Sequence, residues 1–330
     1  MKDNDIRPAA IMTKQEILIY KDAINLSKKL RNFRKVNCPS CGSKKNIFFL
    51  KKRFFKYQIC LICETYFMSP RPTEKILDMH YTNSLNMKYW SDKIFPISRS
   101  KRIKYIYKPR ANFLIKSLKK FKKKNKSLSY LEIGAADATF AIEVRKFNYF
   151  KNYLLVEPNP GLAKQSKSSK FNVFNGMFED LNTPNKFDCI STFEVIEHIY
   201  SPLNFLKKCN RKLKKKGIIF FSCPNGNGFD VSLMQEESNV IDHEHLNYFN
   251  TKSIELLLRR SGFKPLSITT PGKLDLELVK NFINNKKIKN KFEHSIKWIS
   301  FLNDKDSKLM QKIIQRNNIS SHMFVIAEKK

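Results

Sequence analysis

Four cysteines near the beginning of the sequence have the spacing of a metal-binding site. Cys38 and Cys41 form one Cys-x-x-Cys pair, and Cys60 and Cys63 form a second pair after an interval of eighteen residues. Each pair can bring two thiolates to one point, and Zn²⁺ favours a tetrahedron of four such ligands. The alternative is four ordinary reduced cysteines, but the regular spacing favours zinc. Because four cysteines leave no open coordination position, we expect a structural ion.

The segment between the two pairs predicts the fold of this module. Residues 47–50 and 54–58 have the pattern of two short strands. Two cysteine knuckles joined by such a hairpin make a zinc ribbon. The remaining cysteines lie in apolar surroundings and are expected to be buried and unreactive; they are Cys189, Cys209 and Cys223.

A second group of reactive side chains lies much later in the chain. Glu194, Glu197 and His198 are spaced i, i+3, i+4, which at the start of a helix would place them on one face. His245, in a later loop, could complete a cluster that holds a divalent cation such as Mg, Mn or Fe. His243 lies two residues away in an extended stretch and is expected on the same face as His245. The alternative is that His198 acts alone as a general base while Glu197 faces solvent.

A tight turn after an apolar run predicts a binding site for a nucleotide-like cofactor. Glu132 lies near the end of a predicted strand and Gly134 opens the turn, and the small Ala136 lets a ligand approach the backbone. The following helix begins with free amides that can bind a carboxylate. Glu157 ends the next predicted strand, where a carboxylate can accept hydrogen bonds from both ribose hydroxyls.

Residues 128–270 resemble class I S-adenosylmethionine-dependent methyltransferases. The resemblance is carried by this turn, by Glu157, and by residues 187–192 followed by the segment from Glu194 to His198. It implies that Glu132, Gly134 and Ala136 lie along the methionine part of the cofactor, and that Glu157 binds the ribose. It also implies adenine contacts from Met177 and Phe178 and places Glu194 at the cofactor end. Ala136 and Ala138 replace later glycines of the motif, which counts against a dehydrogenase that must bind a pyrophosphate.

A further resemblance concerns the substrate. The segment from Asp242 to Phe249, together with the cysteine module, is similar to methyltransferases of bacterial surface-polysaccharide gene clusters. It implies O-methylation of a sugar or nucleotide-sugar. Small-RNA 3′-end 2′-O-methyltransferases share the Glu-x-x-Glu-His pattern and a later histidine, so an RNA ribose is the first alternative. The second is a non-catalytic zinc-ribbon binding protein with a degenerate fold, which the intact Glu132, Gly134 and Glu157 disfavour.

The elements that must position these residues can be predicted from the apolar pattern. Short apolar runs alternate with helical patterns at 138–147, 202–215 and 251–261, which is typical of an α/β protein. We expect a Rossmann-like, mostly parallel seven-stranded sheet with helices on both faces, preceded by the zinc ribbon. The predicted strands cover 128–133, 153–156, 171–174, 187–192, 218–222, 265–269 and 323–327. The predicted units are a helical lead-in (1–35), the ribbon (36–72), a basic helical connector (73–126) and a methyltransferase domain (127–330) with a helical insertion at 271–320.

The composition bears on partners and location. Lys and Arg number 63 against 29 Asp and Glu, a net charge of +34 that attracts RNA, DNA or an anionic membrane surface. Most basic residues are lysine, and the runs at 122–124 and 214–216 are expected at turns and helix ends. We therefore expect solvated basic faces rather than a nucleic-acid groove. The sequence has no apolar run long enough for a signal peptide or membrane span, which predicts a cytoplasmic protein.

Overall fold

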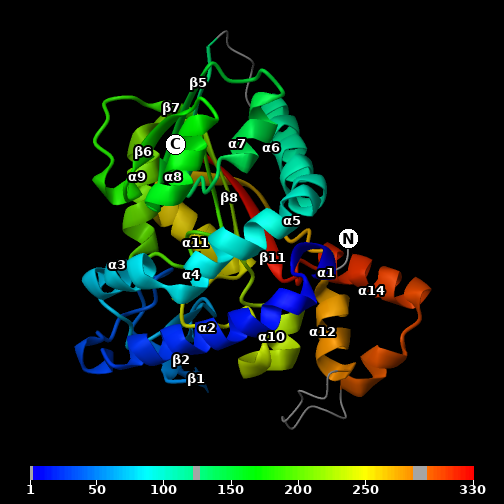
Figure 1. Ribbon diagram of the computed structural model, residues 1–330. Helices are drawn as coiled ribbons and strands as arrows, with labels where there is room; N and C mark the ends of the chain where they lie inside the picture. Colours follow the sequence, from blue (N-terminus) through cyan, green and yellow to red (C-terminus); the bar gives the residue numbers. More distant parts are fainter. Residues whose placement is uncertain (1–2, 122–126, 285–295) are drawn as a thin grey trace.

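The computed structural model describes residues 3–121, 127–284 and 296–330. Its core is a seven-stranded sheet with the order β10-β11-β8-β7-β4-β5-β6 (Figure 1). The strands β8, β7, β4, β5 and β6 are parallel, and β11 runs antiparallel to both of its neighbours. All seven predicted strands are present. They are β4 (Ser129–Ile133), β5 (Asn152–Glu157), β6 (Asn172–Asn175), β7 (Phe187–Phe193), β8 (Leu213–Pro224), β10 (Phe263–Thr269) and β11 (His322–Lys329).

Helices cover both faces of this sheet, as the sequence predicts. On one face, α6 (Lys108–Phe121) and α7 (Thr139–Arg145) pack through side chains such as Leu114 and Phe140. On the other face, α9 (Pro202–Lys212) and α11 (Thr251–Arg260) form a second apolar cluster with the strands. The helix α8 (Pro160–Ser168) connects β5 to β6. Because the sheet is covered on both sides, ligands must bind at the edge where the parallel strands end.

The cysteine module forms a separate small sheet that a later part of the chain completes. Its strands β1 (Asn46–Lys52), β2 (Phe55–Cys60) and β3 (Tyr66–Met68) pair antiparallel in that order. A fourth strand, β9 (Asn247–Tyr248), joins the edge of β3. The loop that carries His245 therefore leads directly into the ribbon sheet. This pairing links residues far apart in the chain, and the apolar pattern did not indicate it.

The N-terminal helices α2 and α4 pack against each other, and α2 lies beside the ribbon strands through residues such as Ala23 and Leu26 (Figure 1). After α1 (Asp3–Ile6), α2 (Ala9–Ser27) and η1 (Leu30–Asn32), the chain enters the ribbon and then α3 (Glu74–Asn83). The segments α4 (Leu85–Tyr89), η2 (Trp90–Ile94), α5 (Phe95–Arg102) and η3 (Ile103–Tyr107) then lead into α6. The chain passes from an α-helical to a π-helical turn between Tyr89 and Trp90. The backbone stays helical because π-helical turns at η2 and η3 absorb the irregular pattern.

The predicted insertion is helical in its described parts. It contains α12 (Asp275–Asn284), η6 (Trp298–Phe301) and α14 (Asp304–Arg316), which pack against α10 (Phe229–Met234) through their own apolar cluster. The next segment in the chain after α10 is η5 (Gln235–Glu237). Of the two lysine runs, 122–124 lies outside the described residues, whereas 214–216 lies within β8 and not at a turn or helix end. Among the residues described, no helix is both long and apolar enough to cross a bilayer.

Candidate functional site

The turn after β4 has the backbone geometry of a ligand cradle. Gly134 has a φ of +74°, and a Cβ at this position would lie 2.8 Å from Cγ2 of Val195, so only glycine fits. Ala136 and Ala138 also have positive φ, at 47° and 61°. These alanines occupy the left-handed region that usually favours glycine, at a cost of roughly 1–2 kcal/mol each. The turn has therefore kept its glycine-type geometry even where the sequence has alanine.

Glu157 lies where the sequence predicted, at the end of β5 and against this turn. Its Oε2 accepts a hydrogen bond from the Ala136 amide (2.8 Å), and its Oε1 accepts one from the Asn159 amide (2.9 Å). Burial raises the pKa of the Glu157 carboxyl, while the two amides oppose that shift. Each oxygen keeps a further lone pair, so the fixed carboxylate can also accept hydroxyl hydrogen bonds.

Two buried ionisable side chains, Glu132 on β4 and Arg110 on α6, influence each other electrostatically near the turn. Glu132 is 2% exposed, and burial raises its pKa to about 8, although the Tyr130 hydroxyl hydrogen bond opposes the shift. The Arg110 guanidinium stacks on the ring of Phe193 at 4.4 Å. Its Nε has no hydrogen-bond partner among the described residues. Sequence reasoning missed Arg110, because an arginine in a basic helix gives no signal of its own.

Met177 and Phe178, both predicted to contact the adenine, differ in how far they are buried. Met177 is half-buried and free to contact a ligand. Phe178 is 3% exposed and packs edge-to-face on Phe205 of α9, with ring centroids 5.5 Å apart. Phe178 is therefore placed in the apolar core beneath the segment.

Glu194 lies at the end of β7 with a partner that the sequence did not indicate. Its Oε1 lies 2.7 Å from Nε2 of His322, and it accepts a hydrogen bond from the Ser222 hydroxyl. Burial alone would raise the pKa of Glu194, but the adjacent His322 holds it well below its ordinary value. His322 begins β11, and because β11 is antiparallel, this first residue lies at the edge where the parallel strands end.

The segment from Glu194 to His198 is not the helix that we predicted. Glu194 has a φ of 54°, and the residues after it form turns in which the His198 amide donates to the Val195 carbonyl. The hydrogen bonds here are those of turns, three residues apart, and the helix α9 starts only at Pro202. The i, i+3, i+4 geometry therefore does not apply here.

Three of the four predicted metal ligands nevertheless converge. Ligand atoms of Glu197, His198 and His245 lie within 4.8 Å of one another, and Glu194 is not in this group. The two imidazole rings meet edge-to-face with centroids 4.7 Å apart. We refer to Glu197, His198 and His245 as the edge cluster.

Backbone carbonyls fix the tautomers of both imidazoles. Nδ1 of His198 lies 2.8 Å from the Glu244 carbonyl oxygen, and Nδ1 of His245 lies 2.8 Å from the Val240 carbonyl oxygen. A carbonyl only accepts, so each Nδ1 carries the proton and each Nε2 keeps its lone pair. Burial lowers the pKa of His198 to about 3 and also lowers that of His245, so both rings are neutral at neutral pH. Histidines that bind metals are typically held in this way.

Glu197 completes the cluster with a buried carboxyl group. Its side chain has no exposed surface, and neither oxygen has a hydrogen-bond partner within the described ranges. Burial, and after it the charge of Glu194, raises the pKa of Glu197 well above its ordinary value. We predicted that Glu197 would face solvent if His198 acted alone, and that part of the alternative is wrong.

His243 does not share a face with His245, contrary to our expectation. Ligand atoms of His243 group with those of His80 and Glu244, while His245 groups with His198 and Glu197. The chain turns between the two histidines, as the His245 amide hydrogen bond to the Asp242 carbonyl shows, so the alternation of an extended strand does not hold.

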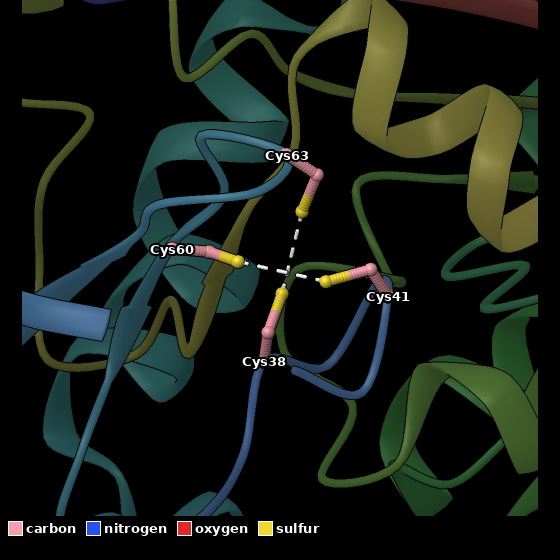
Figure 2. Close-up of side chains that lie close together, drawn as sticks. All are labelled: Cys38, Cys41, Cys60 and Cys63. Carbon is pink, nitrogen blue, oxygen red and sulfur yellow. Dashed lines mark hydrogen bonds between the residues drawn. The ribbon is translucent and has the colours of Figure 1, made fainter. Parts of the chain in front are cut away.

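The four predicted zinc ligands also converge, with their sulfur atoms pointing toward one another (Figure 2). The sulfurs of Cys38 and Cys63 are 3.4 Å apart, and those of Cys41 and Cys60 are 3.5 Å apart. Zn–S bonds of about 2.3 Å give a tetrahedron with edges of about 3.8 Å, close to these separations. Four thiols this near cannot all ionise unless a cation balances their charge, so the donor set fits Zn²⁺.

The cysteine knuckles dock on the helix that follows the His245 loop. Asn250, the N-cap of α11, donates to the carbonyl of Cys63 at 3.0 Å. The Ser40 hydroxyl donates to the Ser253 carbonyl at 2.6 Å, and Arg260 donates to the Ser40 carbonyl. The ribbon therefore contacts α11 at both of its ends and, through β9, the loop before it.

Comparisons with known proteins point to one kind of domain, a methyltransferase domain. Residues 106–268 match a family of methyltransferase domains. Solved structures with a similar fold include an S-adenosylmethionine-dependent methyltransferase from Clostridium acetobutylicum (12% identity, 76% of this chain and 99% of that chain, TM-score 0.45). Others are the plantazolicin methyltransferase BpumL bound to SAH (12%, 77% and 94%, 0.49) and a SAM-dependent methyltransferase from Archaeoglobus fulgidus (19%, 68% and 94%, 0.44). No curated protein matches the sequence.

The sheet order, the turn after β4 and the acid at the end of β5 define a class I methyltransferase fold. With the matched methyltransferase domain, they identify the protein as an S-adenosylmethionine-dependent methyltransferase. Beside the turn around Gly134, each carboxylate oxygen of Glu157 keeps a free lone pair.

Proposed function

We propose that this methyltransferase acts on a hydroxyl group of a sugar or nucleotide-sugar. The observation that carries the proposal is the edge cluster, in which ring nitrogens of His198 and His245 lie within 4.8 Å of the unpartnered carboxyl of Glu197. A hydroxyl is a weak nucleophile at neutral pH, and it must lose a proton as its oxygen attacks the sulfonium methyl. The edge cluster can support this reaction in two ways. A histidine can accept the proton, or a metal ion bound by the cluster can stabilise the negative charge on the oxygen.

The cation form is the one that we favour. Two imidazoles and a carboxylate bind divalent metals such as Mn or Fe, and such an ion lowers the pKa of a bound hydroxyl. It would also account for the buried Glu197, whose ionised form has no balancing cation within the described residues. Two vicinal hydroxyls on a sugar could bind together at this point. Without a metal, the Nε2 atom of His198 is the proton acceptor.

The cofactor's charged end would lie between Arg110 and Glu132. The methionine carboxylate would pair with the buried guanidinium of Arg110, and its ammonium group would pair with the carboxylate of Glu132. Support comes from the unpartnered Nε of Arg110 and from the raised pKa of Glu132, which an ammonium neighbour would bring down. Glu157 would hold the ribose, and Met177 would lie along the adenine.

In this proposal, Zn²⁺ at the four cysteines has a structural role. The four thiolates fill a tetrahedral coordination shell, and the knuckles contact α11 through Asn250 and Ser253 rather than the cofactor turn. The ion would stabilise the ribbon and, through it, the loop that carries His245.

A methyl-transfer assay with labelled S-adenosylmethionine tests the substrate class. We expect label in nucleotide-sugars and none in short RNAs with a free 3′ ribose. Methyl transfer to the RNAs alone would contradict the sugar proposal and identify the 3′-terminal ribose of RNA as the acceptor. That ribose also has two vicinal hydroxyls that could bind at the edge cluster. A cytoplasmic location and a loose association with anionic membranes remain predictions from composition.

A further inference from the structure

A second group of potential metal ligands lies next to the edge cluster. It includes Glu244, whose backbone carbonyl contacts His198. Ligand atoms of His80, His243 and Glu244 lie within 4.8 Å of one another. His80 comes from α3 in the N-terminal part of the chain, whereas the other two come from the loop before β9. Tyr81 separates this group from the edge cluster, because its hydroxyl donates to the Glu244 carbonyl and lies 3.1 Å from His198. We refer to His80, His243 and Glu244 as the junction cluster.

Buried imidazole nitrogens without partners point to a ligand at the junction cluster. The His243 side chain is fully buried, with its Nδ1 against Asp242, and its Nε2 lacks a hydrogen-bond partner among the residues that the structure describes. Within the same part of the chain, Nε2 of His80 is also buried and unpartnered. A buried polar atom left without a partner costs about 1–3 kcal/mol. Two such atoms in one group of ligands, Nε2 of His243 and Nε2 of His80, would be satisfied by a shared ligand.

The surroundings hold two of the three side chains in the orientation that metal ligands need. Oδ1 of Asp242 lies 2.5 Å from Nδ1 of His243, and Oδ2 of Asp242 pairs with Arg53 at 2.8 Å. A carboxylate next to one imidazole nitrogen leaves the other, Nε2, to bind a metal. Glu244 is fixed in a similar way, since Nδ2 of Asn86 donates to both of its carboxylate oxygens at 3.2 and 3.1 Å.

We propose that the junction cluster binds a divalent transition metal that joins the N-terminal helices to the loop carrying His245. Two imidazoles and one carboxylate favour zinc or iron over Mg²⁺ or Ca²⁺, which prefer ligand sets made of oxygen alone. The ion would be separate from both the cysteine site and the edge cluster. It would stabilise the contact between α3 and the loop before β9, because its ligands come from both of these segments. The proposal does not depend on the substrate class or on a metal at the edge cluster.

Cobalt(II) is a suitable probe because it distinguishes the sites. Cobalt bound by thiolates shows a sulfur-to-metal charge-transfer band, whereas cobalt bound by nitrogen and oxygen does not. The full chain is freed of metal, titrated with cobalt under anaerobic conditions, and then analysed for bound cobalt by mass spectrometry. The parent protein is compared with His243→Gln and His80→Gln. Glu197→Gln removes the edge cluster separately, and His322→Gln serves as a histidine control from outside both clusters.

We expect His243→Gln and His80→Gln each to lose one equivalent of cobalt without any loss of the charge-transfer band. Glu197→Gln should leave that equivalent in place, and His322→Gln should bind as much cobalt as the parent. If circular dichroism shows that His243→Gln does not fold, His80→Gln and Glu244→Gln decide, because those two side chains are only partly buried. Equal cobalt content in the folded junction variants and the parent would overturn the proposal.

Discussion

The cysteine site and the edge cluster both gather metal ligands, but they are built in opposite ways. The four cysteines come from one stretch of the chain between Cys38 and Cys63, and their sulfurs meet in a closed tetrahedral arrangement. The edge cluster joins Glu197 and His198 to a residue from a distant loop, His245, and has only three ligands. A closed set of four excludes substrate, whereas three ligands leave room for one. The first is suited to stability and the second to chemistry.

The two sites are nevertheless coupled through the same loop. The segment between Asp242 and Asn250 supplies His245 to the edge cluster, β9 to the ribbon sheet, and the cap that contacts Cys63. Damage to the ribbon should therefore reach the chemistry, while damage to the edge cluster should leave the ribbon intact. This asymmetry can be tested by substitution at each site.

The largest effect is expected at the cysteine site. Cys60→Ser leaves three thiolates, and structural zinc in small modules contributes about 10–16 kcal/mol of apparent binding free energy. We expect loss of zinc, a thermal midpoint lowered by roughly 10 °C or more, and loss of activity. Cys209→Ala is the matched control, since Cys209 is fully buried away from the ribbon. Normal zinc content in Cys60→Ser would contradict the assignment of this residue.

The edge cluster should show the opposite behaviour. Glu197→Gln and His245→Ala are each expected to lower kcat by about 10²- to 10⁴-fold, the range for a lost acid–base or metal-binding group. Zinc content and cofactor binding should stay at the parent level, as measured by mass spectrometry and calorimetry. Glu255→Gln, at an exposed carboxylate on α11, should retain full activity. Full turnover by both edge variants would remove the cluster from the reaction.

The cofactor side of the site should make stability depend on pH. The pKa of Glu132 is raised to about 8 in the folded protein, so the folded state keeps a proton that the unfolded chain loses. The free energy of unfolding of the cofactor-free protein should therefore fall as pH rises from the ordinary carboxyl range to about 8, by up to about 1.4 kcal/mol per pH unit. Urea titrations at several pH values in this range should show that the free energy of unfolding changes less with pH in Glu132→Gln than in the parent protein. If the free energy of unfolding changes equally with pH in both proteins, burial does not raise the pKa of Glu132 as described.

The smallest effect concerns the ribose. Glu157→Ala removes hydrogen bonds to charged oxygen worth about 1.5–3 kcal/mol each, so S-adenosylmethionine should bind about tenfold more weakly or worse. Calorimetry measures the change, and the zinc content should not respond. Unchanged binding would mean that the ribose does not lie at the end of β5.

Local signals in the sequence predicted much of this molecule. The spacing of the cysteine pairs was enough to predict the metal site. Short apolar runs between helical patterns were enough to predict the strands. The turn at Gly134 and the acid at Glu157 are likewise local, and both were placed at the correct strand ends. These features were predictable because each is decided within a few residues.

Features that depend on long-range contacts were not predictable. Glu194 pairs with His322 across 128 positions, and β9 joins a sheet whose other strands lie far earlier in the chain. The helix expected at 194–198 is absent, because Glu194 adopts a left-handed conformation and the residues after it form turns. His243 and His245 were placed on one face by a strand periodicity that the turn there does not follow.

Turnover after selective removal of metal tests the central claim most directly. The enzyme is treated with a chelator until every ion outside the cysteine site is gone, and zinc at the four cysteines is measured in parallel. Methyl transfer to the nucleotide-sugar acceptor is then followed before and after a divalent cation is restored. The account predicts that activity is lost while one zinc per chain remains, and that it returns with the added cation. Full turnover by an enzyme that holds only its ribbon zinc would contradict the metal at Glu197, His198 and His245.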